Sequence, residues 1–346
     1  MIVLLIFPVF MNEKIYNTPK VNETQQLERG LVKWKDYQLA GESSGDPDMV
    51  AEGMTNQIEY LYRLSRVDEA RAFLKNIPDS VDLDQPQVRE ILADIYIMAD
   101  DTNYFYDWYR QNLFHREANA GDQILVYALL CHNRNSEART VFEKTFPALA
   151  SLEHFTYALQ HIPKLIEDRG QREFYYRTIL ERCSGATMDS SEQIEWYEIQ
   201  LKTLYCLNDI SRFENTAHAM AQVYPEDAQQ HLDFLERLKD RNNPKWRENK
   251  VFGIGLSKTG TSSLSKALTL LDFSTAHWTN PYSHDLLMKE DIPLFDSLTD
   301  ITVSYQYREI YEEYPDAKFV LSTRSIEDWE KSFLNHYTRS MHAKKF

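Results

Sequence analysis

Cysteine is scarce in this chain and shows no pattern where it occurs. The 346 residues include three cysteines, Cys131, Cys183 and Cys206, which are scattered through segments expected to be helical. Their spacing does not match a metal site, and three thiols in a chain of this length indicate a reducing compartment without a disulfide framework. We therefore expect a cytoplasmic protein whose cysteines pack in the core.

Positive charge is also in short supply. The formal net charge is −15, with 27 Lys and Arg against 40 Asp and Glu in residues 1–249, and 11 against 13 in residues 250–346. An acidic chain without a basic stripe argues against general nucleic-acid binding. Because the acidity belongs to the N-terminal part, it would not strongly repel an anionic ligand bound in the C-terminal part.

A hydrophobic run long enough to cross a membrane is missing. The apolar N-terminus, MIVLLIFPVF, has about ten residues, contains Pro8, and lacks the basic start and cleavage site of a signal peptide. A short strand, a tail or a wrongly assigned start fits it better than a targeting signal, and we expect no membrane segment. A length of 346 residues and a hydrophobic content of 43% predict two packed domains.

Amphipathic helices fill the sequence from about residue 47 to 240. Glu69-Ala70-Arg71 recurs as Glu137-Ala138-Arg139, a shift of 68 residues, or twice 34. Polar turns at Asp101–Tyr104 and Asp168–Gln171 stand about 34 residues after each copy. A 34-residue period of paired helices resembles the tetratricopeptide repeat, and about five such units would stack into a superhelix. This resemblance implies either a concave surface for a protein or peptide partner or a spacer that stabilises the rest of the chain.

The segments that flank these helices are less regular. Residues 1–46 are expected to be an irregular segment, apart from a short helix near Leu27–Leu39. The polar stretch Asp240–Asn249 contains Pro244 and is typical of a boundary between domains.

The most informative stretch is Lys250–Leu271, KVFGIGLSKTGTSSLSKALTLL. Val251–Leu256 is apolar and short, which predicts a buried parallel strand. A turn rich in Gly, Ser and Thr follows, and Leu264, Ala267, Leu268 and Leu271 then recur with the spacing of a helix that packs one face. Such a strand–turn–helix presents free backbone N–H groups at the positive end of a helix, a favourable place for a phosphate.

The turn differs from the phosphate loop of ATP- and GTP-binding proteins. Thr261 follows Gly260 where those proteins carry a lysine, and Lys258 stands earlier, inside the loop. This arrangement resembles the 5′-phosphosulfate loop of sulfotransferases, which use 3′-phosphoadenosine 5′-phosphosulfate (PAPS). The resemblance implies that Lys258, Thr259, Gly260, Thr261 and Ser262 bind the 5′-phosphate of PAPS, and that Lys258 also stabilises the leaving group.

A second stretch supports the resemblance. Lys318–Thr323 reads as a buried strand with Arg324 at its end, and a helix is expected over Glu327–Tyr337, with Trp329, Phe333 and Leu334 on one face. Sulfotransferases hold the 3′-phosphate with an arginine after such a strand and a serine eight residues later. Arg324 and Ser332 have that separation, which implies that they bind the 3′-phosphate.

The remaining elements predict the fold of residues 250–346. Phe273–Ala276 and Leu294–Asp296 are expected strands, and Tyr305–Tyr314 is an expected helix. Alternating strands and helices indicate an α/β domain with three layers and a parallel sheet. The chain as a whole is expected to be multidomain, an all-α helical repeat followed by this α/β domain.

The resemblance implies metal-free transfer of a sulfuryl group from PAPS to a hydroxyl or amine. A base must take up the proton of the acceptor, and three side chains that follow expected strands are candidates: His277, Asp296 and Asp300. His277 could instead be structural, and the two carboxylates could instead contact the acceptor or cap a helix.

Two alternatives stay open. The chain could be a helical-repeat scaffold with an inactive nucleotide-binding remnant, or a P-loop nucleotide kinase or NTPase. The second is disfavoured by Thr261 in place of the loop lysine and by the lack of an evident aspartate for Mg²⁺.

At 97 residues, the α/β part is shorter than expected for a sulfotransferase, so we expect a C-terminally truncated, incomplete domain. The sequence leaves the oligomeric state and the acceptor open.

Overall fold

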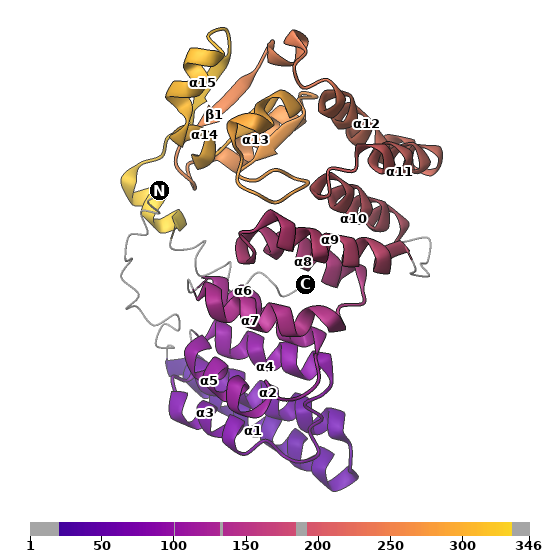
Figure 1. Cartoon of the computed structure of the whole chain (residues 1–346). Coiled ribbons are helices and arrows are strands. Elements are labelled where there is room, and N and C mark those ends of the chain that lie inside the picture. The colour runs from indigo at the N-terminus through magenta and orange to yellow at the C-terminus, as the bar shows by residue number, and fades with distance from the viewer. Residues whose placement is uncertain (1–20, 100, 132–133, 185–191, 334–346) are drawn as a thin grey trace. The chain divides into compact units, whose positions relative to one another are not determined.

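The computed structural model of the chain describes residues 21–99, 101–131, 134–184 and 192–333 (Figure 1). The apolar N-terminus lies outside these residues. Among the helices that are described, none is long and apolar enough to cross a membrane. The chain forms two compact units, with a division between Ala148 and Leu149.

The first unit is helical. Its first helix, α1, has 24 residues, so the short helix expected near Leu27–Leu39 is present but longer than predicted, and the described part of the expected irregular segment is mostly helical. Pro47 begins the next helix, where proline is tolerated because the first N–H groups of a helix have no partner within it. The elements are α1 (Val21–Ser44), α2 (Pro47–Arg63), α3 (Val67–Lys75), α4 (Pro86–Met98), α5 (Thr102–Asn112), η1 (Ala120–Asp122), α6 (Gln123–Cys131), α7 (Asn135–Thr145) and η2 (Phe146–Ala148).

The helices repeat as pairs along the sequence. Helices α3, α5 and α7 begin at Val67, Thr102 and Asn135, so their starts are 35 and 33 residues apart. The ion pair of Arg66 with Glu69 (2.6 Å) at the start of α3 recurs as Arg134 with Glu137 (3.2 Å) at the start of α7. These features agree with a helical repeat of about 34 residues, while its assignment to the tetratricopeptide class stays a prediction.

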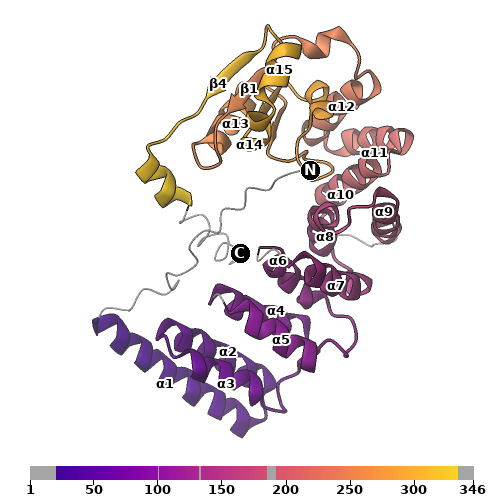
Figure 2. The same ribbon diagram turned by 60° about the vertical axis from the view of Figure 1, so that its left-hand side comes forward.

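The second unit combines helices with a small sheet. Five long helices precede the first strand, and shorter helices connect the strands (Figure 2). The helices are α8 (Leu152–Leu165), α9 (Arg169–Ser184), α10 (Gln193–Cys206), α11 (Ile210–Val223), α12 (Pro225–Lys239), η3 (Pro244–Arg247), α13 (Thr261–Thr269), η4 (Lys289–Leu294), α14 (Ile301–Tyr305) and α15 (Tyr307–Glu313). The strands are β1 (Val251–Ile254), β2 (Thr275–His277), β3 (Ser297–Thr299) and β4 (Lys318–Leu321).

The four strands form one parallel sheet in the order β2-β3-β1-β4. Val251 of β1 pairs with Ser297 of β3 on one side and with Lys318 of β4 on the other. From β1 the chain crosses towards β2, and from β3 it crosses in the opposite direction to β4. Ligands of open α/β sheets bind at the carboxyl ends of the strands where such connections diverge, which here means β1 and β3.

The sheet lies between two layers of helices, as expected for an α/β domain. Gly253 faces Leu264 of α13, whereas the ring of the preceding Phe252 packs against Tyr314, which follows α15 (5.9 Å between centroids). Neighbouring residues of a strand point to opposite faces, so α13 and the segment of α15 cover different sides of β1. This confirms the three layers and the parallel sheet.

Helices α10–α12 share their core with the sheet. The ring of Phe234 in α12 stacks on Tyr282, in the loop after β2, with centroids 3.9 Å apart. His231 of the same helix lies 2.8 Å from the Tyr282 hydroxyl. The compact units therefore divide the chain at a different place from the boundary predicted near Asp240–Asn249.

Several element boundaries differ from the sequence prediction. The third strand is Ser297–Thr299, because Leu294 belongs to η4 and Asp296 precedes the strand. Strand β4 is exposed rather than buried, since it forms the edge of the sheet. Leu271 was expected to pack but is 67% exposed, since α13 ends at Thr269.

Candidate functional site

The loop between β1 and α13 forms a tight turn that depends on its small residues. A Cβ atom at Gly255 would stand 2.7 Å from the Ser322 carbonyl oxygen and 2.8 Å from the Thr259 hydroxyl, too close for any side chain. Gly260, just before α13, has φ +105°, a conformation that favours glycine. Lys258 has φ +72° without being glycine, and such left-handed residues gather at functional sites.

Lys258 is half-buried in this loop. Burial lowers the pKa of its ammonium group, and the carboxylate of Asp300 partly offsets that effect. Lys258 stands three residues before the start of α13, so an anion bound at this helix N-terminus would lie close to a lysine and would also meet the helix dipole.

Asp300 follows β3 and holds the loop from the adjacent strand. One carboxylate oxygen accepts from the Ser257 hydroxyl (2.7 Å) and the other from the Thr261 hydroxyl (3.0 Å). The residue is 5% exposed and adopts φ +94° with ψ −173°, a region used almost only by glycine. The Thr261 hydroxyl donates its hydrogen bond to Asp300. For Thr261 to bind the 5′-phosphate as expected, either this hydroxyl must leave Asp300 or the backbone N–H of Thr261 must make the contact instead.

His277 ends β2 and lies against Asp300 and α13. Its Nε2 is 3.2 Å from the Asp300 carboxylate and 3.0 Å from the Ser262 hydroxyl, and its Nδ1 is 2.8 Å from the Thr299 hydroxyl. Burial lowers the pKa of His277, and the nearby Lys258 lowers it as well, whereas Asp300 raises it. Both ring nitrogens thus have partners, so His277 must exchange one of them before it can accept a proton from a substrate.

Asp296 lies elsewhere. It precedes β3, whereas Asp300 follows it, so the two carboxylates stand at opposite ends of a three-residue strand. The Asp296 carboxylate binds Arg237 of α12 (2.9 Å) and accepts from the backbone N–H of Ser274 (3.0 Å). The expectation that Asp296 follows a strand is wrong, and its observed contacts join α12 to the sheet.

Arg324 and Ser332 belong to the segment after β4. Ser325 caps the N-terminus of the helix of residues 326–333. Its hydroxyl accepts from the Asp328 N–H (3.1 Å) and donates to the Asp328 carboxylate (2.9 Å). Arg324 directly precedes this cap and is exposed, while Ser332 is half-buried. The expected continuation of this helix from residue 334 to Tyr337 lies outside the described residues.

The loop after β1 and the segment after β4 contact each other. The hydroxyl oxygens of Thr259 and Ser322 are 2.9 Å apart, and the indole N–H of Trp329 donates to the Ser257 carbonyl (2.8 Å). Strands β1 and β4 are adjacent and parallel, so Lys258 and Arg324 both follow the carboxyl ends of neighbouring strands.

The structure therefore groups most of the predicted residues at one edge. Lys258–Ser262, His277 and Asp300 lie together, with Arg324 and Ser332 on the adjoining segment, whereas Asp296 lies at the other end of the strands. Sequence reasoning gave no site role to Ser257 or Ser322, and it expected Trp329 only to pack on one face of its helix, although all three take part in the contacts between the Lys258 loop and the segment after β4. It also missed Ser304 of α14, whose hydroxyl accepts from the Gly255 N–H at 2.7 Å.

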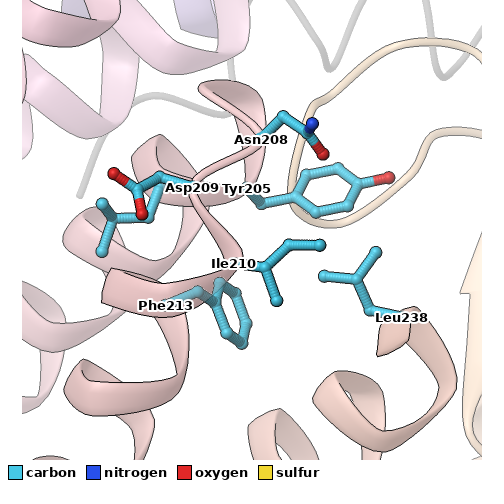
Figure 3. A pocket seen from close by; sticks show the side chains of 7 residues that line it. Tyr205, Asn208, Asp209, Ile210, Phe213 and Leu238 are labelled. Atoms are coloured by element: carbon cyan, nitrogen blue, oxygen red, sulfur yellow. The ribbon is translucent and has the colours of Figure 1, made fainter. Parts of the chain in front are cut away.

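A small pocket elsewhere in the unit has different surroundings (Figure 3). It is lined by the ends of α10 and α12 and the start of α11, with Tyr205, Phe213 and Leu238 among its walls. None of the predicted nucleotide contacts lines it. In the part of the chain that is described, no cluster of three or more His, Cys, Asp or Glu side chains could hold a metal ion.

Comparison with known proteins agrees with this geometry. A family model described as a sulfotransferase domain matches residues 250–296 and 288–346, two overlapping segments that together cover the α/β part and none of residues 1–249. The match supports a sulfotransferase domain in the C-terminal part of the chain. Neither the curated proteins nor the solved structures provide a match.

Proposed function

We propose that residues 250–346 bind PAPS and transfer its sulfuryl group to a hydroxyl or amine acceptor. One observation carries the proposal: Lys258 and Arg324 follow the adjacent parallel strands β1 and β4, and hydrogen bonds join their two segments. A nucleotide with phosphates at its 5′ and 3′ positions carries negative charge at two separate places. Cationic residues after two neighbouring strands, such as Lys258 and Arg324, suit both charges. The sulfotransferase family match covers both segments.

In the proposed reaction, the acceptor oxygen or nitrogen attacks the sulfur of PAPS. The bond between the sulfur and the bridging oxygen breaks, and its electron pair remains on the 5′-phosphate of the product, adenosine 3′,5′-bisphosphate. Lys258 and the backbone N–H groups at the start of α13 would stabilise this developing charge. The acceptor proton would pass to His277 or Asp300, whose mutual contact of 3.2 Å makes them a coupled pair.

One observation favours the NTPase alternative. In P-loop NTPases a loop Ser or Thr and an aspartate from a nearby strand hold Mg²⁺. Thr261, the first residue of α13, and Asp300, which follows β3, form such a pair, with 3.0 Å between the hydroxyl and the carboxylate, so Asp300 is a candidate for the aspartate that the sequence argument did not find. The position of Lys258, three residues before Thr261, still differs from that of the NTPase lysine.

Calorimetry on the full chain separates these functions. We expect adenosine 3′,5′-bisphosphate to bind without Mg²⁺, and Lys258→Ala and Arg324→Ala each to weaken binding at least tenfold, the loss of about one charged hydrogen bond. Lys266→Ala, which changes an exposed lysine farther along α13, serves as the control. Tight binding of ATP only with Mg²⁺ would favour the NTPase, and no binding of either nucleotide would favour the scaffold.

A further inference from the structure

Trp329 connects the two halves of the proposed nucleotide site. It stands five residues after Arg324 and three before Ser332, in the helical turn of residues 326–333. Its indole N–H donates to the backbone carbonyl of Ser257, 2.8 Å away in the loop after β1. Its ring stacks on Phe333, with centroids 5.3 Å apart and an angle of 28° between the planes.

The carbonyl that Trp329 contacts belongs to the peptide group between Ser257 and Lys258. This peptide is trans, so its carbonyl and its N–H point in opposite directions. A hydrogen bond that holds the Ser257 carbonyl toward the indole therefore turns the N–H of Lys258 away from it. It also helps to hold Lys258 in its left-handed conformation, φ +72°, which a lysine adopts only when its surroundings enforce it.

We propose that Trp329 is a positioning residue that fixes the distance between the Lys258 loop and the Arg324–Ser332 segment. The site thereby selects nucleotides with phosphate groups at both the 5′ and the 3′ position over those with a 5′-phosphate alone. This inference rests on the proposed function. The contact of Thr259 with Ser322 joins the same segments closer to the sheet, so loss of the indole donor loosens the outer part of the site without separating the strands.

The test compares two ligands on the full chain. Trp329→Phe keeps an aromatic ring against Phe333 and removes only the N–H donor. Calorimetry gives the dissociation constants of adenosine 3′,5′-bisphosphate and adenosine 5′-monophosphate. We expect the variant to bind the bisphosphate about five- to tenfold more weakly, the usual effect of one lost hydrogen bond, and the monophosphate almost unchanged. Trp246→Phe is the matched control, because the indole nitrogen of Trp246 has no hydrogen-bond partner among the described residues.

A second variant tests the donor itself. Trp329→Gln offers an N–H donor of similar reach without the ring, and it should retain more of the preference for the bisphosphate than Trp329→Phe does. If both Trp329 variants keep the wild-type ratio of the two affinities, the inference is wrong and the proposed function stands. If the wild-type protein does not prefer the bisphosphate, the proposed function fails as well.

Discussion

The hydroxyl oxygens of Thr259 and Ser322 lie 2.9 Å apart and join the loop after β1 to the end of β4. These residues are 63 positions apart in the sequence. Thr259 directly follows Lys258, and Ser322 stands two residues before Arg324. The contact forms because β1 and β4 are neighbours with their carboxyl ends at the same edge. The packing around it leaves no room at Gly255.

Gly255→Ala should disrupt this packing. The new methyl group would meet the Ser322 carbonyl oxygen at 2.7 Å and the Thr259 hydroxyl at 2.8 Å, so the loop must shift. We expect a loss of stability of about 1–3 kcal/mol, typical of overpacking, together with weaker nucleotide binding. Urea unfolding and calorimetry measure the two effects. Gly170→Ala, where the nearest neighbour of the new Cβ is the movable Asp168 side chain at 3.2 Å, should change neither by much.

Asp296→Asn should act on stability and leave nucleotide binding unchanged. The Asp296 carboxylate pairs with Arg237 of α12 at 2.9 Å, and Arg237 is 9% exposed, so a buried guanidinium would lose its counter-charge. We expect the free energy of unfolding to fall by about 1.5–3 kcal/mol, the range for a hydrogen bond to a charged group. If Asp296→Asn instead keeps its stability and loses sulfuryl transfer, Asp296 takes part in the reaction.

The stability of the protein should rise with pH in a way that depends on Lys250. This side chain is 1% exposed and donates to the backbone carbonyls of Ile292 and Phe295, and burial lowers its pKa from 10.5 to about 7. Between these two values the unfolded chain binds more protons than the folded one, so the free energy of unfolding should increase from about pH 7 towards pH 10.

Lys250→Met isolates this effect, because it removes the titrating group and leaves the others in place. Urea unfolding at pH 7 and pH 9 should show a larger gain for the wild-type protein than for the variant. Equal gains would mean that Lys250 keeps its ordinary pKa in the folded protein.

In the first unit, Arg89→Met should be strongly destabilising. Arg89 and Asp122 are 1% and 2% exposed and lie 3.1 Å apart, so the variant leaves a buried carboxylate without its cation. Removal of one partner from such a pair costs about 3–5 kcal/mol. Arg116→Met breaks an exposed pair with Asp84 (3.3 Å) and should cost less than about 1 kcal/mol. Similar losses in urea unfolding for both variants would contradict the assigned burial.

The sequence predicted the strand–turn–helix of residues 250–271 because its signals are local. A short apolar strand, a turn of small residues and an amphipathic start of a helix stand within Lys250–Leu271, and the structure has β1, the turn and α13 there. The helical pairs were predictable for a similar reason, because their period is carried by neighbouring residues.

The strand that precedes Asp300 was harder to predict. Leu294–Asp296 is as apolar as Ser297–Thr299, and a three-residue strand has too few residues for its pattern to fix a register. The exposure of β4 could not be read either, since an apolar run does not reveal whether a strand is central or at the edge of a sheet.

By itself, the sequence determined the residue types that can hold a phosphate, their order, and the strand–turn–helix that presents them. Only the tertiary structure decided which of the candidates meet, because contacts between Ser257 and Trp329 or between His277 and Asp300 depend on the order of the strands. The bounds of β3 placed Asp296 at the opposite end of the strand from Asp300, beside Arg237, since four residues along an extended chain carry a side chain from one end of a short strand to the other.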